Sequence, residues 1–163
     1  MLEELKTELE RFGRENDCAN SERDRRMLNI TRETGEFLAV LVRATGARRI
    51  LEIGTSNGYS TLWLAEVAKV TGGQVITVEF SEYKAGLAAE TFMRSGLGSI
   101  ISLLHEDAGQ VLRRSGLSWR RPLGAVPLLR MAVPSKSNGA TSCTVLRTLL
   151  SVGNSGTTPG RTL

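Results

Sequence analysis

Residues with the chemistry of a nucleoside site follow two apolar segments of the sequence. Residues 52–60 read Glu-Ile-Gly-Thr-Ser-Asn-Gly-Tyr-Ser, and their two glycines let the backbone turn tightly and approach a ligand closely. The free amides of a helix that starts there suit a carboxylate or a phosphate. Glu79 follows the second apolar segment, 25 residues beyond Gly54, about where an acid reaches the two hydroxyls of a ribose. Together these residues predict a site for a nucleoside-containing cofactor.

The spacing of the glycines narrows the type of cofactor. A nicotinamide dinucleotide site has the pattern Gly-x-Gly-x-x-Gly, whereas Gly54 and Gly58 are separated by Thr, Ser and Asn. This spacing disfavours a pyrophosphate and favours a smaller, amino-acid-like group. The alternative is a plain glycine turn, because many α/β proteins have one between a strand and a helix without binding a nucleotide.

The elements that must position these residues alternate along the chain. Apolar periodicity and glycine breaks predict helices at 1–15, 31–44, 60–70, 82–95 and 108–112, and strands at 48–54, 74–79 and 99–104. Crossovers of this length require parallel strands, so we expect an α/β protein with a Rossmann-like, doubly wound parallel sheet and N-terminal helices. Residues 16–26 are expected to form a loop. The side chains expected to face the core from two of the helices are Phe37, Leu38, Leu41, Val42, Leu87, Ala88, Phe92 and Met93.

The composition changes abruptly after the third predicted strand. Residues 1–107 carry 13 basic and 17 acidic side chains, whereas the last 56 residues carry eight basic and none acidic, so the net charge changes from −4 to +8. All four prolines also lie after residue 112, and Pro127 interrupts the only candidate fourth strand, 123–133. We therefore divide the chain into N-terminal helices (1–45), a cofactor-binding core (46–112) and an atypical basic segment (113–163). This last segment is predicted to be disordered, above all from residue 151 on, or translated out of frame; a natural basic tail is the alternative.

Several classes of protein do not fit the sequence. It has no apolar run long enough to span a membrane, and its first 25 residues lack the apolar centre of a secretory signal. Its two cysteines are far apart, which predicts neither a disulfide framework nor a zinc site. We expect a cytoplasmic protein. Nucleic-acid binding by the basic segment is disfavoured, because its charges are scattered and Trp119 is its only aromatic residue.

Four segments resemble one enzyme family. Residues 51–60 are similar to the first motif of the S-adenosylmethionine-dependent O-methyltransferases related to catechol and caffeoyl-CoA O-methyltransferases. Residues 27–31 with the following Gly35 and Phe37, residues 78–79 and residues 105–108 also resemble that family. The resemblance covers about residues 20–112. It implies methyl transfer from S-adenosylmethionine to a hydroxyl of a small, catechol-like acceptor.

The resemblance also implies which residues bind the cofactor. The implied contacts are Gly54 and Ser56 at the methionine end, Glu52, Tyr59 and Ser60 at its amino and carboxylate groups, Asn29 and Ile30 closing over it, Glu79 at the ribose hydroxyls, Phe80 on the adenine face, and Asp107 and Ala108 at the adenine edge. Packing of Tyr59, a core position for Phe80 and capping of a helix by Asp107 are the alternatives. The only histidine, His105, is interpreted as a surface or structural residue, and no catalytic residue is assigned.

The sequence departs from the family in two respects. The family fold implies about seven strands, but only three are legible, so the sheet is predicted to be truncated after the third strand. Family members that use Mg²⁺ need carboxylate ligands from later parts of the fold, and this sequence has no Asp or Glu after Asp107. We therefore predict that the metal site is absent. Two functions remain open: an active O-methyltransferase, or a non-catalytic remnant that binds S-adenosylmethionine. The oligomeric state is left open, with a homodimer as the candidate.

Overall fold

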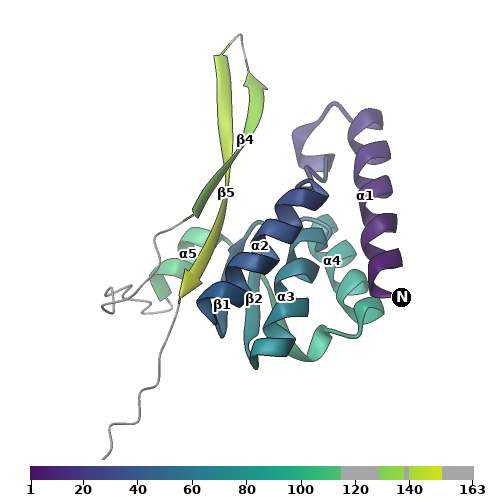
Figure 1. The fold of residues 1–163 in the computed structure, drawn as a ribbon. Coiled ribbons are helices and arrows are strands. Elements are labelled where there is room, and N and C mark those ends of the chain that lie inside the picture. Colours follow the sequence, from purple (N-terminus) through teal and green to yellow (C-terminus); the bar gives the residue numbers. More distant parts are fainter. Residues whose placement is uncertain (115–128, 138–139, 152–163) are drawn as a thin grey trace, which may run out of the picture.

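The computed structural model describes residues 1–114, 129–137 and 140–151 (Figure 1). Its centre is a parallel sheet of β1 (Arg49–Ile53), β2 (Gln74–Glu79) and β3 (Ile101–His105), in the order β3-β2-β1. The helices α3 (Tyr59–Thr71) and α4 (Glu82–Ser95) connect these strands. The predicted Rossmann-like α/β fold is confirmed. Because the strands are parallel, their carboxyl ends lie at one edge, where the loops after β1 and β2 meet.

Two layers of helices cover the sheet. The helices α1 (Leu2–Ala19), α2 (Arg32–Thr45), α3 and α4 share one apolar core with the sheet, in which Leu38, Leu62 and Val75 are fully buried. On the opposite face, α5 (Ala108–Arg114) packs Val111 against Leu51 and Val78. Figure 1 shows α1 to α4 on one side of the strands and α5 on the other. Among the described residues, no helix combines the length and apolarity that a membrane crossing requires.

Three local features differ from the expectations. The helix α1 continues to Ala19, one turn beyond the predicted end. Only the short 3₁₀ turn η1 (Arg23–Arg25) separates it from the irregular segment 26–31 before α2. A second 3₁₀ turn, η2 (Gly98–Ile100), occupies the expected start of β3. Phe37 and Met93 are 53% and 77% exposed rather than buried.

The exposure of Phe37 follows from how α2 packs. Its buried face is formed by Gly35, Leu38 and Val42, which follow helical spacing. A Cβ at position 35 would lie 2.5 Å from Nε1 of Trp63, so the absence of a side chain there lets this indole approach the helix. Phe37 lies on the other side of α2.

Two antiparallel strands extend the sheet beyond β1, and the first of them shares residues 129–133 with the candidate strand 123–133. The strands β4 (Leu129–Ser137) and β5 (Ala140–Ser151) pair with each other antiparallel, and β5 pairs antiparallel with β1, which gives the order β3-β2-β1-β5-β4. The parallel part of the described sheet contains three strands, as predicted. The disorder or frame error expected for residues 113–163 stays a prediction. Pro134 lies in β4, an edge strand, which is where proline is found within sheets. The rest of the candidate strand 123–133, and residues 152–163, lie outside the described residues.

Candidate cofactor-binding site

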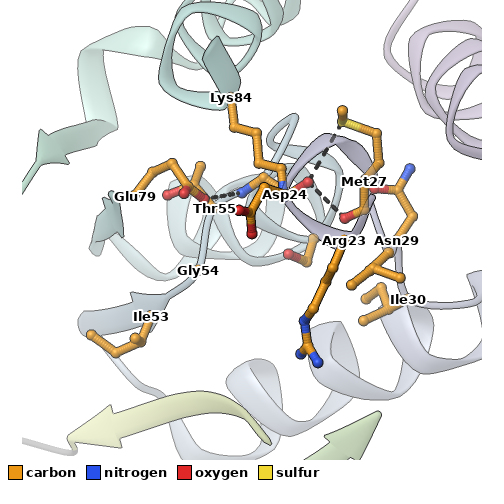
Figure 2. Close-up of a pocket in the computed structure, with 13 residues that line it drawn as sticks. Arg23, Asp24, Met27, Asn29, Ile30, Ile53, Gly54, Thr55, Glu79 and Lys84 are labelled. Atoms are coloured by element: carbon orange, nitrogen blue, oxygen red, sulfur yellow. Dashed lines mark hydrogen bonds between the residues drawn. The ribbon is translucent and has the colours of Figure 1, made fainter. Parts of the chain in front are cut away.

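A cavity of about 240 Å³ lies at the carboxyl ends of β1 and β2 (Figure 2). Three segments form its walls: the chain before α2, the turn after β1, and the end of β2. Its lining residues are Arg23, Asp24, Met27, Leu28, Asn29, Ile30, Ile53, Gly54, Thr55, Ser56, Ser60, Glu79 and Lys84. Six of the eleven residues implied by the family resemblance are therefore brought together: Asn29, Ile30, Gly54, Ser56, Ser60 and Glu79.

The turn after β1 has an unusual backbone. Gly54 and Gly58 have φ values of 89° and 86°, which only glycine adopts readily, and Ser56 has a φ of 52°. A left-handed serine is held at a cost of about 1–3 kcal/mol, and such strain clusters at functional sites. Two hydrogen bonds hold Ser56 there: its amide donates to Oε2 of Glu79 at 2.8 Å, and its hydroxyl donates to the carbonyl of Met27 at 2.7 Å. The turn is therefore fastened to both neighbouring walls of the cavity.

The carboxylate of Glu79 is fixed by backbone amides. Its Oε1 accepts hydrogen bonds from the amides of Phe80 and Ser81 at 3.0 and 2.9 Å, and its Oε2 accepts the one from Ser56. A carboxylate offers about four lone-pair positions. Oε2 therefore keeps one acceptor position for a hydroxyl in the cavity. Hydrogen bonds to a charged acceptor are the stronger kind, so this position suits a ribose.

Glu52 lies behind the cavity and not on its surface. It is fully buried, and its carboxylate accepts hydrogen bonds from the hydroxyls of Ser60 and Thr61 and, at 2.7 Å, of Thr77. Burial raises the pKa of Glu52 above its ordinary value, against the effect of these three donors. Glu52 thus orients Ser60, which does line the cavity, at the start of α3. Gly58 has no side chain to cap that helix, and Oδ1 of Asn57 accepts only its first amide, that of Tyr59, at 3.2 Å. The amides that follow can bind an anionic group.

Tyr59 is turned away from the cavity towards α1. Its ring is buried and meets Trp63 edge to face, and its hydroxyl donates to Oε1 of Glu10 at 2.6 Å. Burial, and next the hydrogen bond to Glu10, raise the pKa of Tyr59 well above its ordinary value. In the structure Tyr59 therefore packs α3 against α1.

The other residues implied by the resemblance are placed as follows. Asn29 lines the cavity, but its amide group donates to the carbonyl of Leu9 at 3.0 Å and so anchors the wall to α1. Phe80 is 75% exposed and does not line the cavity. Asp107 caps α5 by accepting the amide of Gln110 at 2.9 Å, and Ala108 packs against the cluster around Leu51. Neither of these two lines the cavity.

Seven lining residues were not identified from the sequence. Thr55 and Ile53 belong to the first motif, and Met27 and Leu28 belong to another segment that resembles the family. Their positions within these segments could therefore have identified them as lining residues. Arg23, Asp24 and Lys84 had no such signal, because the polar run 16–26 predicted only a loop and Lys84 only a helix surface. Arg23 and Asp24 belong to η1 and line the cavity together with the turn after β1 (Figure 2).

Comparison with known proteins identifies the class of this fold and site. The sequence profile of the O-methyltransferase family matches residues 5–117. Catechol O-methyltransferases from Mycobacterium tuberculosis and Niastella koreensis are 37% and 36% identical over 75 and 85 residues, which cover 46% and 52% of this chain. These alignments cover only 34% and 38% of the two relatives.

Solved structures give the same result. An O-methyltransferase from Bacillus cereus in complex with SAH (S-adenosylhomocysteine) has a TM-score of 0.57 and 33% identity, over 73% of this chain and 50% of that one. The O-methyltransferase TomG from Streptomyces achromogenes, in complex with SAM (S-adenosylmethionine), has a TM-score of 0.54 and 30% identity, over 67% and 48%. The fold is that of the class I methyltransferases. The chain belongs to the O-methyltransferase family, and it spans about a third to a half of the length of these relatives.

The described residues do not fit a magnesium site. They contain no group of three or more His, Cys, Asp or Glu side chains that could hold a metal ion. Mg²⁺ is bound through oxygen ligands, chiefly carboxylates. Two carboxylates line the cavity, Asp24 and Glu79, and Glu79 already accepts three backbone amides. We therefore derive no step through a metal.

Proposed function

We propose that the cavity binds SAM and that the site serves methyl transfer to a hydroxyl of a small, catechol-like acceptor. The observation that carries this proposal is the fixed carboxylate of Glu79, which keeps an acceptor position at the cavity beside the strained turn at Ser56. The names of the relatives support it: two are catechol O-methyltransferases, and two structural neighbours hold SAH or SAM.

The residues of the chain would each contribute to binding. Glu79 would accept a ribose hydroxyl, and the first turn of α3 with Ser60 would hold the carboxylate of the methionine part. Gly54 would let the cofactor approach the backbone. The bound cofactor would supply an electrophilic methyl group on its sulfonium. The wall 27–30 would exclude water from one side of it.

A second function is favoured by a specific observation: this chain binds the cofactor but does not itself transfer the methyl group. A phenol hydroxyl has a pKa near 10 and attacks poorly until it is deprotonated or bound to a metal. The described residues contain no group of side chains that could hold a metal ion and activate such a hydroxyl. The family match ends at residue 117, close to the change in composition after residue 112.

Two assays separate these functions. Calorimetric titration with SAH tests the cofactor site, and absence of binding would contradict both functions. Transfer of labelled methyl from SAM to catechol, with and without Mg²⁺, tests catalysis. We expect binding without turnover for this chain, and turnover for a chain whose sequence after residue 112 is read in the alternative frame. Equal turnover by both chains would contradict the binding-only function. The cytoplasmic location and a homodimer stay predictions.

A further inference from the structure

A carboxylate outside the cavity holds one of its walls. Asp17 lies in the last turn of α1, and it does not line the cavity. We propose that Asp17 is a positioning residue of the cofactor site, which holds the backbone of Met27 and Leu28 in the conformation that forms the wall. This inference rests on the proposed function, because the ligand of that wall is SAM.

The two oxygens of Asp17 bind two consecutive backbone amides. Oδ1 accepts the amide of Met27 at 2.6 Å, and Oδ2 accepts the amide of Leu28 at 2.9 Å. Asn16 donates to Oδ1 at 3.1 Å, and Nε of Arg26 lies 4.0 Å from Oδ2. The Asp17 side chain is only 16% exposed. Charge-assisted hydrogen bonds in such a shielded place are among the stronger ones.

Asp17 stabilises a backbone conformation at Leu28 that is unfavourable for a residue with a side chain. Leu28 has a φ of 52°, in the left-handed region, which costs a residue with a Cβ about 1–3 kcal/mol. Leu28 lines the cavity directly. A single carboxylate that binds the amides on both sides of the Met27 α-carbon offsets this cost and selects one arrangement of the wall.

The effect of Asp17 continues across the cavity through hydrogen bonds. The carbonyl of Met27 accepts the hydroxyl of Ser56 at 2.7 Å, and the amide of Ser56 donates to Glu79. The path Asp17–Met27–Ser56–Glu79 thus joins α1 to the end of β2. Figure 2 shows the two ends of this part of the path, where dashed lines reach Met27 and Glu79. Loss of Asp17 should therefore loosen both the wall and the turn after β1.

The same helix offers a matched control. Glu8 of α1 pairs with Arg94 of α4, with distances of 2.9 and 2.5 Å between their nitrogen and oxygen atoms. Neither residue lines the cavity or contacts the wall. Glu8→Gln therefore removes the ion pair between α1 and α4 and leaves the residues of the cofactor site unchanged.

The test compares Asp17→Asn with Glu8→Gln in the full chain, after circular dichroism has shown that both variants are folded. Asparagine keeps one acceptor oxygen and so leaves one of the two amides unpaired. Calorimetry with SAH should show binding weakened about tenfold or more for Asp17→Asn and within twofold of the unaltered protein for Glu8→Gln. Amide exchange by NMR, without ligand, should become faster at Met27 and Leu28 only in Asp17→Asn.

Each other outcome overturns the inference. Unchanged SAH affinity in Asp17→Asn, equal losses in both variants, or unchanged exchange at Met27 and Leu28 would show that Asp17 does not position the wall. If the unaltered chain does not bind SAH, the proposed function fails and this inference fails with it. If the unaltered chain binds and Asp17→Asn binds equally well, only this inference fails.

Discussion

The backbone amide of Ser56 lies 2.8 Å from Oε2 of Glu79 and donates a hydrogen bond to it. This bond joins the turn after β1 to the end of β2, so that the glycine-containing turn and the carboxylate of Glu79 face the same cavity. It also uses part of the acceptor capacity of Glu79. The carboxylate is therefore both a structural centre of the site and its best contact for a ribose.

Glu79→Gln should weaken SAH binding about tenfold to a hundredfold, because a hydrogen bond to a charged group contributes about 1.5–3 kcal/mol. His105→Ala is the comparison, since His105 lies exposed at the end of β3 and contacts the carbonyl of Phe80. It should leave the affinity within twofold. Calorimetry measures both. Similar losses of SAH affinity in the two variants would contradict the proposal that Glu79 binds the ribose.

Tyr59→Phe should lower stability without affecting cofactor affinity. The variant loses the hydrogen bond to the carboxylate of Glu10, a loss of about 1.5–3 kcal/mol in the free energy of unfolding. Tyr83→Phe, at a half-exposed ring, should change little. Denaturant titration gives the stabilities, and SAH titration gives the affinities. A large loss of SAH affinity in Tyr59→Phe would contradict this prediction and would support the cofactor contact that the family resemblance implies for Tyr59.

Gly58→Ala should destabilise the fold by about 2–4 kcal/mol, through backbone strain and overpacking. Gly58 has a φ of 86°, and a Cβ there would lie 2.6 Å from Cε1 of Phe92. Gly86→Ala in α4 is the matched control, because nothing lies within 4 Å of the added Cβ. It should be neutral or stabilise the helix by up to about 1 kcal/mol. If thermal melting shows that Gly58→Ala and Gly86→Ala change stability equally, the prediction that the turn at Gly58 is tightly packed is wrong.

Glu52→Gln should remove a pH dependence of stability. Burial raises the pKa of Glu52 above its ordinary value of 4.5. Between these two pKa values the unfolded chain has lost a proton that the folded chain keeps, so stability falls as the pH rises through this window. The stability of Glu52→Gln relative to the unaltered protein should therefore increase as the pH rises from about 4, and then level off.

Denaturant titrations at a series of pH values measure this dependence. Glu15→Gln, at an exposed position, is the control for the substitution itself. A relative stability of Glu52→Gln that falls over the same pH range would mean that the buried carboxyl has a lowered pKa.

The sequence predicted the parallel part of the fold because the information there is local. A window of about ten residues is enough to recognise each of its parts: the strands β1 and β2, the glycine turn from Gly54 to Gly58, and the acid Glu79. The carboxyl ends of parallel strands must then meet at one edge. This is why the cavity falls where the sequence placed it.

The rest of the site depends on long-range packing that the sequence does not reveal. Tyr59 stands in the recognised motif, but the position of α1 decides that its hydroxyl meets Glu10 and not the cavity. Asp17 stands in a segment expected to be a loop, and only the fold brings it to Met27. The antiparallel pairing of β5 with β1 joins residues about a hundred positions apart, beyond the reach of any local pattern.

The central claim is that SAM occupies the cavity between residues 27–30, the turn after β1 and Glu79. The most direct test is an amide NMR titration of the 163-residue chain with SAH. We predict that the amide signals of Leu28, Ser56 and Ser60 shift the most, and that those of Thr7 and Arg11, on the outer side of α1, stay in place. Binding that shifts signals elsewhere and leaves Ser56 and Ser60 unmoved would contradict the account, as would the absence of any shift at saturating SAH.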